Sequence, residues 1–195
     1  MKSSISIPNI LTLIRILLTP LFVIVLLRDE RGQALLIFSL AAISDGLDGL
    51  IARIFQQRTP LGAILDPIAD KLLMTAAFVS MAALKMLPAW LSVIVISRDL
   101  LILLGMGLFT MNRIEIEIRP RLDSKFTTTA QLVTVIWVLL DWQAPPAPMI
   151  TAVAFGLTAV LTIVSGLHYI YIGLNVLQEG GRNNGKGTGR NKAEG

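Results

Sequence analysis

Residues 45–70 read DGLDGLIARIFQQRTPLGAILDPIAD, and they decide the fold because they put acidic side chains into two segments that are otherwise apolar. The acidic residues are Asp45, Asp48, Asp66 and Asp70. An aspartate in the middle of a membrane helix costs about 2.5 to 3.5 kcal/mol, so four that faced lipid would cost about 10 to 14 kcal/mol. That sum is comparable to the stability of a whole domain. We therefore expect the four carboxylates to face a polar cavity or a bound cation.

The composition of the whole chain indicates that these segments lie in a membrane. Of 195 residues, 54% are hydrophobic and 15% are charged, and the mean hydropathy is +0.71. A soluble domain averages about 25% charged residues, and a chain of this size cannot bury so much apolar surface in one aqueous core. The chain has no cysteine, which excludes disulfides and thiolate metal sites.

Six apolar runs are separated by proline, glycine and charged residues. They span residues 9–27, 33–54, 67–84, 89–109, 126–142 and 148–177. The runs are rich in Leu, Ala and Met and lack the alternation of barrel strands, so they predict an all-α integral membrane protein with six transmembrane helices. We expect the first run to be a retained helix, since Arg15 interrupts it and no signal-peptide cleavage site follows.

The distribution of Lys and Arg predicts the orientation. Eleven of the 17 lie on the side that carries the amino terminus, three lie on the opposite side, and Arg15, Lys71 and Arg98 fall within spans. The positive-inside rule then places both termini in the cytoplasm, with the acidic site facing the cytoplasm from the inner (plasma) membrane. Residues 1–178 are predicted to form the membrane domain, and the Gly-, Asn- and Lys/Arg-rich residues 179–195 a disordered basic tail.

The spacing of the aspartates predicts a metal site. Asp45 and Asp48 are three residues apart and Asp66 and Asp70 four, so members of each pair lie within about 60° of one another on a helix. A short turn at residues 56–59 would make the two helices antiparallel neighbours and bring both pairs to one depth. Two divalent cations would balance four carboxylates, and all-oxygen ligation suits Mg²⁺ or Mn²⁺.

Small residues around the aspartates favour a bound substrate rather than an ion alone. Gly46, Gly49 and Gly62 each cost about 1 kcal/mol of helix propensity relative to alanine, but they leave room for a base or a phosphate to approach the backbone. Arg53 lies at the end of the same segment, where it could neutralise a phosphate.

These residues spell a known pattern. Asp45, Asp48, Gly49, Ala52 and Arg53, then eight residues, then Gly62, Asp66 and Asp70 match every defined position of DxxDGxxAR, eight residues, GxxxDxxxD. This motif resembles that of the CDP-alcohol phosphotransferases. The opening residues 7–15, IPNILTLIR, and the six-span layout extend the resemblance.

The resemblance implies an enzyme that moves the phosphatidyl group of CDP-diacylglycerol to a glycerol-type alcohol and releases CMP. It implies that two Mg²⁺ or Mn²⁺ ions are held by Asp45, Asp48, Asp66 and Asp70, with Asp70 as the general base. It further implies a homodimer among membrane lipids, without a nucleic-acid partner. The residues that would frame the CDP group are Asp48, Gly49, Ala52, Arg53 and Gly62.

Basic residues outside the motif are candidates for binding the acceptor. Arg119 and Lys125 precede the fifth run and could bind either an acceptor phosphate or anionic headgroups. Arg98 is expected to bind an anion with Asp99 orienting it, although a purely structural pair is the alternative. Because adjacent residues point about 100° apart on a helix, we expect Arg98 and Asp99 not to pair directly.

The sequence leaves the acceptor open. The opening residues and the length resemble the phosphatidylglycerophosphate synthase branch, which uses glycerol 3-phosphate, and we slightly favour this acceptor. Residues 96–99, ISRD, resemble the cardiolipin synthase branch, which uses phosphatidylglycerol. A divalent-cation transporter is the alternative from a different class. A structural alternative is that the four carboxylates are only paired with Arg15, Lys71 and Arg98.

Overall fold

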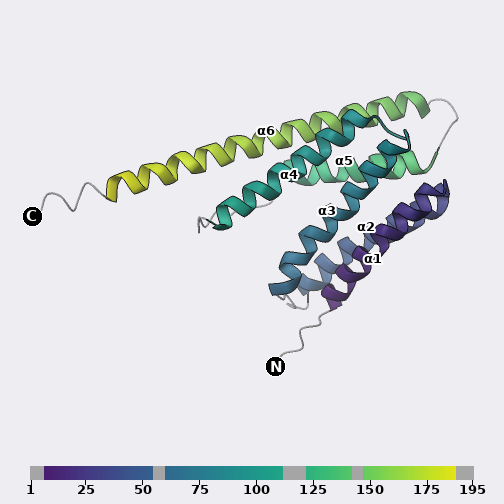
Figure 1. Ribbon diagram of the computed structural model, residues 1–195, viewed down its shortest axis with the longest axis horizontal. Coiled ribbons are helices and arrows are strands. Elements are labelled where there is room, and N and C mark those ends of the chain that lie inside the picture. The colour runs from purple at the N-terminus through teal and green to yellow at the C-terminus, as the bar shows by residue number, and fades with distance from the viewer. Residues whose placement is uncertain (1–6, 55–59, 112–121, 142–146, 188–195) are drawn as a thin grey trace, which may run out of the picture.

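The computed structural model describes residues 7–54, 60–111, 122–141 and 147–187, and side chains for 10–44, 69, 71–105, 125–141 and 147–173. These residues form helices and turns, with no strand among them (Figure 1). The helices are α1 Ile7–Leu27, α2 Arg31–Ile54, α3 Pro60–Ala83, α4 Ala89–Met111, α5 Leu122–Leu139 and α6 Ala147–Gly187. The predicted all-α fold and its six helical segments are confirmed.

Successive helices alternate in direction, so the bundle has two distinct ends (Figure 1). We call the end where α1 begins, α2 ends and α3 begins the motif end. We call the opposite end, where turns join α1 to α2 and α3 to α4, the turn end. Residues 45–54 and 60–70 therefore occupy the motif end.

The helices form two groups of three. In the first group α1 packs against α2 and α3, and in the second α6 packs against α4 and α5. Contacts of α3 with α4 and α5, and of α2 with α5, join the groups. Figure 1 shows that the groups approach one another at the turn end and spread apart toward the motif end.

The apolar core lies toward the turn end. Phe22 and Phe38 are fully buried with ring centroids 5.6 Å apart, and Phe78, Leu91 and Val135 extend the same cluster. They come from the halves of α1 to α5 that are nearest the turn end. Close packing of these large side chains holds the two groups together there.

Long polar side chains are buried from the middle of the bundle toward the motif end. Arg15, Arg98, Asp99 and Gln131 each have at most 4% of their surface exposed. Such groups are tolerated inside a bundle only when they are paired or hydrogen-bonded. The described interior of the bundle thus holds charged groups near its middle, in addition to the apolar core at the turn end.

A seam of hydrogen bonds joins α5 to α6. Thr134 and Thr158 hydroxyls lie 2.7 Å apart, Gln131 Nε2 donates to Thr162 Oγ1 over 3.3 Å, and Thr127 Oγ1 donates to the Leu161 carbonyl over 3.1 Å. Lipid supplies no hydrophobic drive for helix association, so small polar residues commonly hold membrane helices together.

Exposed apolar side chains cover the outside of the helices. Leu17 on α1, Val93 on α4 and Leu167 on α6 are each more than 60% exposed. Among the described residues, windows long and apolar enough to cross a membrane are found in Ile10–Leu27 and Ala147–Gly173. The described parts of α2 and α3, Arg31–Ser44 and Lys71–Ala83, are shorter apolar stretches. That all six helices cross the membrane, and that both termini are cytoplasmic, stay predictions.

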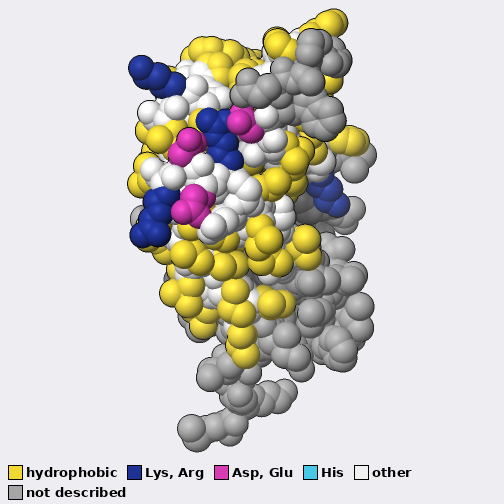
Figure 2. All heavy atoms as spheres, turned by 90° about the vertical axis from the view of Figure 1, so that its right-hand side faces the viewer, with side chains coloured by type: hydrophobic (Ala, Val, Ile, Leu, Met, Phe, Trp, Pro, Cys, Tyr) yellow, Lys and Arg dark blue, Asp and Glu magenta, His cyan; other side chains and the backbone are white. Residues whose placement is uncertain are grey.

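Charged residues gather at the turn end, on the face that Figure 2 shows. Arg31 at the start of α2 forms ion pairs with Asp29 and, across the two groups, with Asp141 after α5. The turns after α1, α3 and α5 each contain a residue other than glycine in the left-handed conformation. These residues are Asp29, Lys85 and Asp141, with φ of 59°, 58° and 49°.

Two helix boundaries differ from the expected runs by more than five residues. Helix α3 begins at Pro60 rather than Pro67, because proline suits the first helical position, where its missing N–H is not needed. Helix α6 continues through Gly187, past residue 179, where we expected the tail to begin. Helix geometry does not by itself make these residues part of a packed domain, so the division at residue 178 stays a prediction.

Candidate functional site

The aspartate motif is split between two helices joined by a short connection. Asp45, Asp48, Gly49, Ala52 and Arg53 lie on α2, and Gly62, Asp66 and Asp70 on α3. Their side chains are outside the described set, so the helix backbones alone place them.

The backbones put the two halves of the motif at similar heights. Asp48 is six residues before the end of α2 and Asp66 six residues after the start of α3, so each lies about 9 Å along its helix from the connection. Asp45 and Asp70 are nine and ten residues from it, or about 14 and 15 Å. The arrangement is compatible with one shared site.

Helix α1 packs against both motif helices. Its Arg15 is fully buried and lies eight residues from Ile7, about 12 Å along α1 from the motif end. Thr12 is also fully buried, and the Thr19 hydroxyl donates to the Arg15 carbonyl over 2.9 Å. A basic residue is therefore buried in the group of helices that carries the motif.

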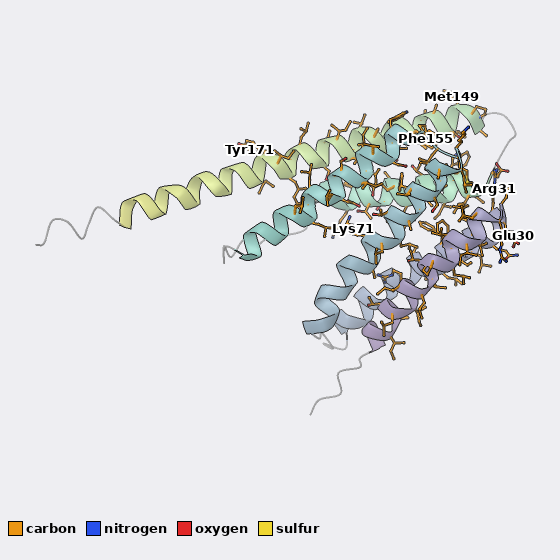
Figure 3. The ribbon with its side chains drawn as sticks, in the orientation of Figure 1. Glu30, Arg31, Lys71, Met149, Phe155 and Tyr171 are labelled. Atoms are coloured by element: carbon orange, nitrogen blue, oxygen red, sulfur yellow. The ribbon has the colours of Figure 1, made fainter. Side chains whose placement is uncertain are left out.

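A second polar cluster joins the two groups of helices. Lys71 on α3 contacts Asp99 on α4, with Nζ and Oδ1 2.7 Å apart, and Arg98 contacts the same oxygen through Nη1 at 2.8 Å. Arg98 Nη2 donates to Ser165 Oγ on α6 over 2.8 Å, and its guanidinium lies 5.8 Å from the centre of the Tyr169 ring. Figure 3 shows Lys71 where α3 faces α4. We call Lys71, Arg98, Asp99 and Ser165 the bridging cluster.

The bridging cluster corrects the prediction that Arg98 and Asp99 do not pair directly. Neighbouring Cα–Cβ bonds on a helix do diverge by about 100°. The arginine side chain is long enough to turn back across that angle and reach Asp99. The prediction was wrong because it considered where the side chains start and not how far they reach.

Sequence reasoning assigned no role in binding to Lys71, Ser165 or Tyr169. Lys71 carried a signal, since it is a cation within an apolar run and follows Asp70 directly. Ser165 and Tyr169 carried none, because serine and tyrosine are ordinary residues in a membrane helix. Lys71 and Arg98 both contact Asp99, so two of the three bases considered as partners of the motif aspartates have another acidic partner.

The remaining acceptor candidates differ in placement. Lys125 is exposed near the start of α5, where its carbonyl accepts from the Thr129 hydroxyl over 2.8 Å. Arg119 lies outside the described residues.

The residues present fit a divalent metal by their chemistry. Four carboxylates supply the hard oxygen ligands that Mg²⁺ and Mn²⁺ prefer, and their charge matches two such ions. Among the described side chains, no group of three or more His, Cys, Asp or Glu could hold a metal, and the four motif aspartates are not among those side chains. The motif is thus the candidate metal centre.

The fold and the site together define a helical protein with an apolar exterior and charged residues buried in its interior. Comparison with known proteins identifies the class. Residues 5–164 match the family described as CDP-alcohol phosphatidyltransferase. The chain belongs to this family.

Individual relatives carry two kinds of name. A probable phosphatidylglycerophosphate synthase of Mycobacterium tuberculosis is 31% identical over 169 residues, covering 83% of this chain and 78% of the relative. A CDP-diacylglycerol–glycerol-3-phosphate 3-phosphatidyltransferase of Bacillus subtilis is 31% identical and covers 84% and 93%. A cardiolipin synthase (CMP-forming) of Streptomyces coelicolor is 38% identical over 109 residues, covering 53% and 51%.

Family membership makes the chain an enzyme of phospholipid synthesis. It is a membrane phosphatidyltransferase that uses a CDP-linked alcohol, and for a phosphatidyl group that donor is CDP-diacylglycerol. The choice between an enzyme and a divalent-cation transporter is thereby decided for the enzyme.

Proposed function

We propose that the enzyme transfers the phosphatidyl group of CDP-diacylglycerol to glycerol 3-phosphate and releases CMP. The observation that carries this proposal is the complete aspartate motif, distributed at matching heights on two helices joined by a short connection. The Bacillus subtilis relative, whose name states this donor and acceptor, supports the acceptor because the match covers 93% of its length.

In the proposed reaction the acceptor hydroxyl attacks the phosphorus that carries the diacylglycerol. A new P–O bond forms, the P–O bond to CMP breaks, and CMP leaves with the electron pair. Asp70 takes the proton of the attacking hydroxyl as general base. No covalent enzyme intermediate is needed, which agrees with a motif that holds no Ser, Cys or His.

The other motif residues hold the donor. Asp45, Asp48, Asp66 and Asp70 would bind two Mg²⁺ or Mn²⁺ ions, which when bound neutralise charge on the donor diphosphate and on departing CMP. Asp48, Gly49, Ala52, Arg53 and Gly62 would frame the CDP group. The two glycines leave the helix surfaces open, and Arg53 can bind a phosphate oxygen.

Binding of the acceptor alcohol is assigned to Arg98, Arg119 and Lys125. Lys125 is exposed and available at the start of α5, whereas Arg98 is buried with two of its nitrogens hydrogen-bonded. We therefore expect Lys125 and Arg119 to guide the acceptor, and Arg98 to act from inside the bundle.

The setting of the site is part of the proposal. The uneven distribution of Lys and Arg supports six crossings with both termini and the motif end at the cytoplasmic face of the plasma membrane. Residues 1–178 would form the catalytic membrane domain and 179–195 a basic tail at the membrane surface. We expect the enzyme to be a homodimer.

A second candidate acceptor is phosphatidylglycerol. The 38% identity to the Streptomyces coelicolor cardiolipin synthase, although over half the chain, favours it. In that case the product is cardiolipin, and the donor and released CMP are the same.

An assay of CMP release tests the function. Purified protein receives CDP-diacylglycerol and Mg²⁺ with glycerol 3-phosphate, phosphatidylglycerol, inositol phosphate or serine in parallel. We expect CMP only when acceptor is present, fastest with glycerol 3-phosphate, and none after EDTA until Mg²⁺ or Mn²⁺ is restored. Absence of CMP with every acceptor would refute the proposed function. Faster CMP release with phosphatidylglycerol would show that phosphatidylglycerol, and not glycerol 3-phosphate, is the acceptor.

A further inference from the structure

Lys71 is the most accessible charged member of the bridging cluster. Its side chain is 20% exposed, compared with 3% for Arg98 and 5% for Asp99. Arg98 directs Nη1 to Asp99 and Nη2 to Ser165, so its two terminal nitrogens are already engaged within the protein. A ligand that reaches the cluster would therefore meet the Lys71 ammonium first.

Lys71 can contact a further group without leaving Asp99. Among the described side chains, Lys71 and Arg98 contact the same oxygen of Asp99. A lysine ammonium has three N–H donors. The partly exposed Lys71 ammonium can therefore bind an anionic group of a substrate while it keeps its bond to Asp99.

The position of Lys71 relates it to the reaction. It follows Asp70, the proposed general base, in the sequence of α3, so the two Cα atoms are about 3.8 Å apart. Asp99 draws the Lys71 ammonium toward α4. A molecule with its hydroxyl at Asp70 and a phosphate a few bonds away could therefore place that phosphate near Lys71.

We propose that Lys71 binds the phosphate of the acceptor and that Asp99 and Arg98 position it. This inference rests on the proposed function and assigns its acceptor site a residue that the motif does not include. The shared chemistry is a phosphate, carried as a monoester by glycerol 3-phosphate and as a diester by phosphatidylglycerol. Lys71 is the contact, while Arg98 acts through Asp99.

The first experiment measures the KM for acceptor and for CDP-diacylglycerol in Lys71→Gln. We expect the acceptor KM to rise about 10- to 100-fold, the loss typical of one charge-assisted hydrogen bond, while the donor KM stays unchanged. Glycerol 3-phosphate and phosphatidylglycerol are assayed separately, and the acceptor that supports turnover in the wild type is the one that must show the change.

A matched control separates substrate binding from the joining of helices. Arg31→Gln breaks another ion pair between the same two groups, but at the turn end, away from the motif. We expect this variant to keep both KM values. An equal rise of the acceptor KM in both variants, a parallel rise of the donor KM in Lys71→Gln, or no rise at all would overturn the inference.

Chemical rescue keeps the test decisive if Lys71→Gln does not fold. The chain has no cysteine, so Lys71→Cys introduces a unique thiol, and aminoethylation of that thiol rebuilds an ammonium of lysine-like length. We expect the acceptor KM to return toward the wild-type value after aminoethylation but not after alkylation with a neutral reagent. Equal acceptor KM values for the two alkylated proteins would refute a role for the positive charge at position 71. A wild-type enzyme that releases no CMP would instead refute the proposed function.

Discussion

Asp99 holds two cations in the interior, and its replacement by asparagine should be unusually destabilising. The Asp99 side chain is 5% exposed and accepts from Lys71 and Arg98 at 2.7 and 2.8 Å. Asp99→Asn keeps the shape of the side chain but removes the negative charge that both cations contact. Removing one partner of a buried ion pair costs about 3 to 5 kcal/mol, so we expect a loss of that size in the free energy of unfolding.

Asp141→Asn is the matched control. It makes the same chemical change in a pair whose side chains are 33% and 43% exposed, and exposed pairs contribute about 0 to 1 kcal/mol. Both free energies of unfolding can be measured in mixed micelles by titration with SDS, followed by circular dichroism. If Asp99→Asn costs no more than Asp141→Asn, the cluster does not carry the buried charge that we describe.

A double variant tests the physical cause. Lys71→Met removes one of the two cations, so Lys71→Met combined with Asp99→Asn should be less destabilised than the sum of the single variants. Residues in one ion-pair network typically couple by about 0.5 to 3 kcal/mol. Strict additivity would show that Lys71 and Asp99 do not interact in the folded protein.

Three further outcomes are expected. Asp70→Asn should lower CMP release about 10²- to 10⁴-fold with an unchanged unfolding midpoint, and retained turnover would exclude Asp70 as the base. Thr134→Val removes a hydroxyl from the seam between α5 and α6, which should cost about 0.6 kcal/mol, the average for such bonds in membrane proteins; a loss above about 2 kcal/mol would point to a larger network. Lys85→Gly relieves a left-handed residue at the turn end and should raise the free energy of unfolding by about 0.5 to 1 kcal/mol, whereas a lower value would show that the lysine side chain stabilises this turn.

Much of the fold could be predicted because apolar runs and their interruptions are local properties of the chain. Proline and glycine mark the turns, and the helix starts and ends follow within a few residues. The start of α3 was the largest error at a helix beginning, because Pro60 and Pro67 both resemble a first helical residue and only the earlier one begins the helix. The extension of α6 through glycine-containing residues could not be read from composition.

The candidate site was predictable to the extent that its residues are close in sequence. The aspartate motif occupies 26 consecutive positions, so its spacing alone indicates carboxylates that share a site. The bridging cluster combines Lys71 with Asp99, 28 positions away, and Arg98 with Ser165, 67 positions away. Those pairs depend on how α3, α4 and α6 pack, which helical periodicity does not determine.

The position of the apolar core has a consequence for how such enzymes diversify. Stability comes largely from the aromatic and aliphatic packing around Phe22, Phe38 and Phe78, and chemistry is assigned to the opposite end. Substitutions that change the accepted alcohol need not disturb this packing, whereas substitutions in the bridging cluster affect both stability and binding. The same helical scaffold can then carry different acceptor sites in different relatives.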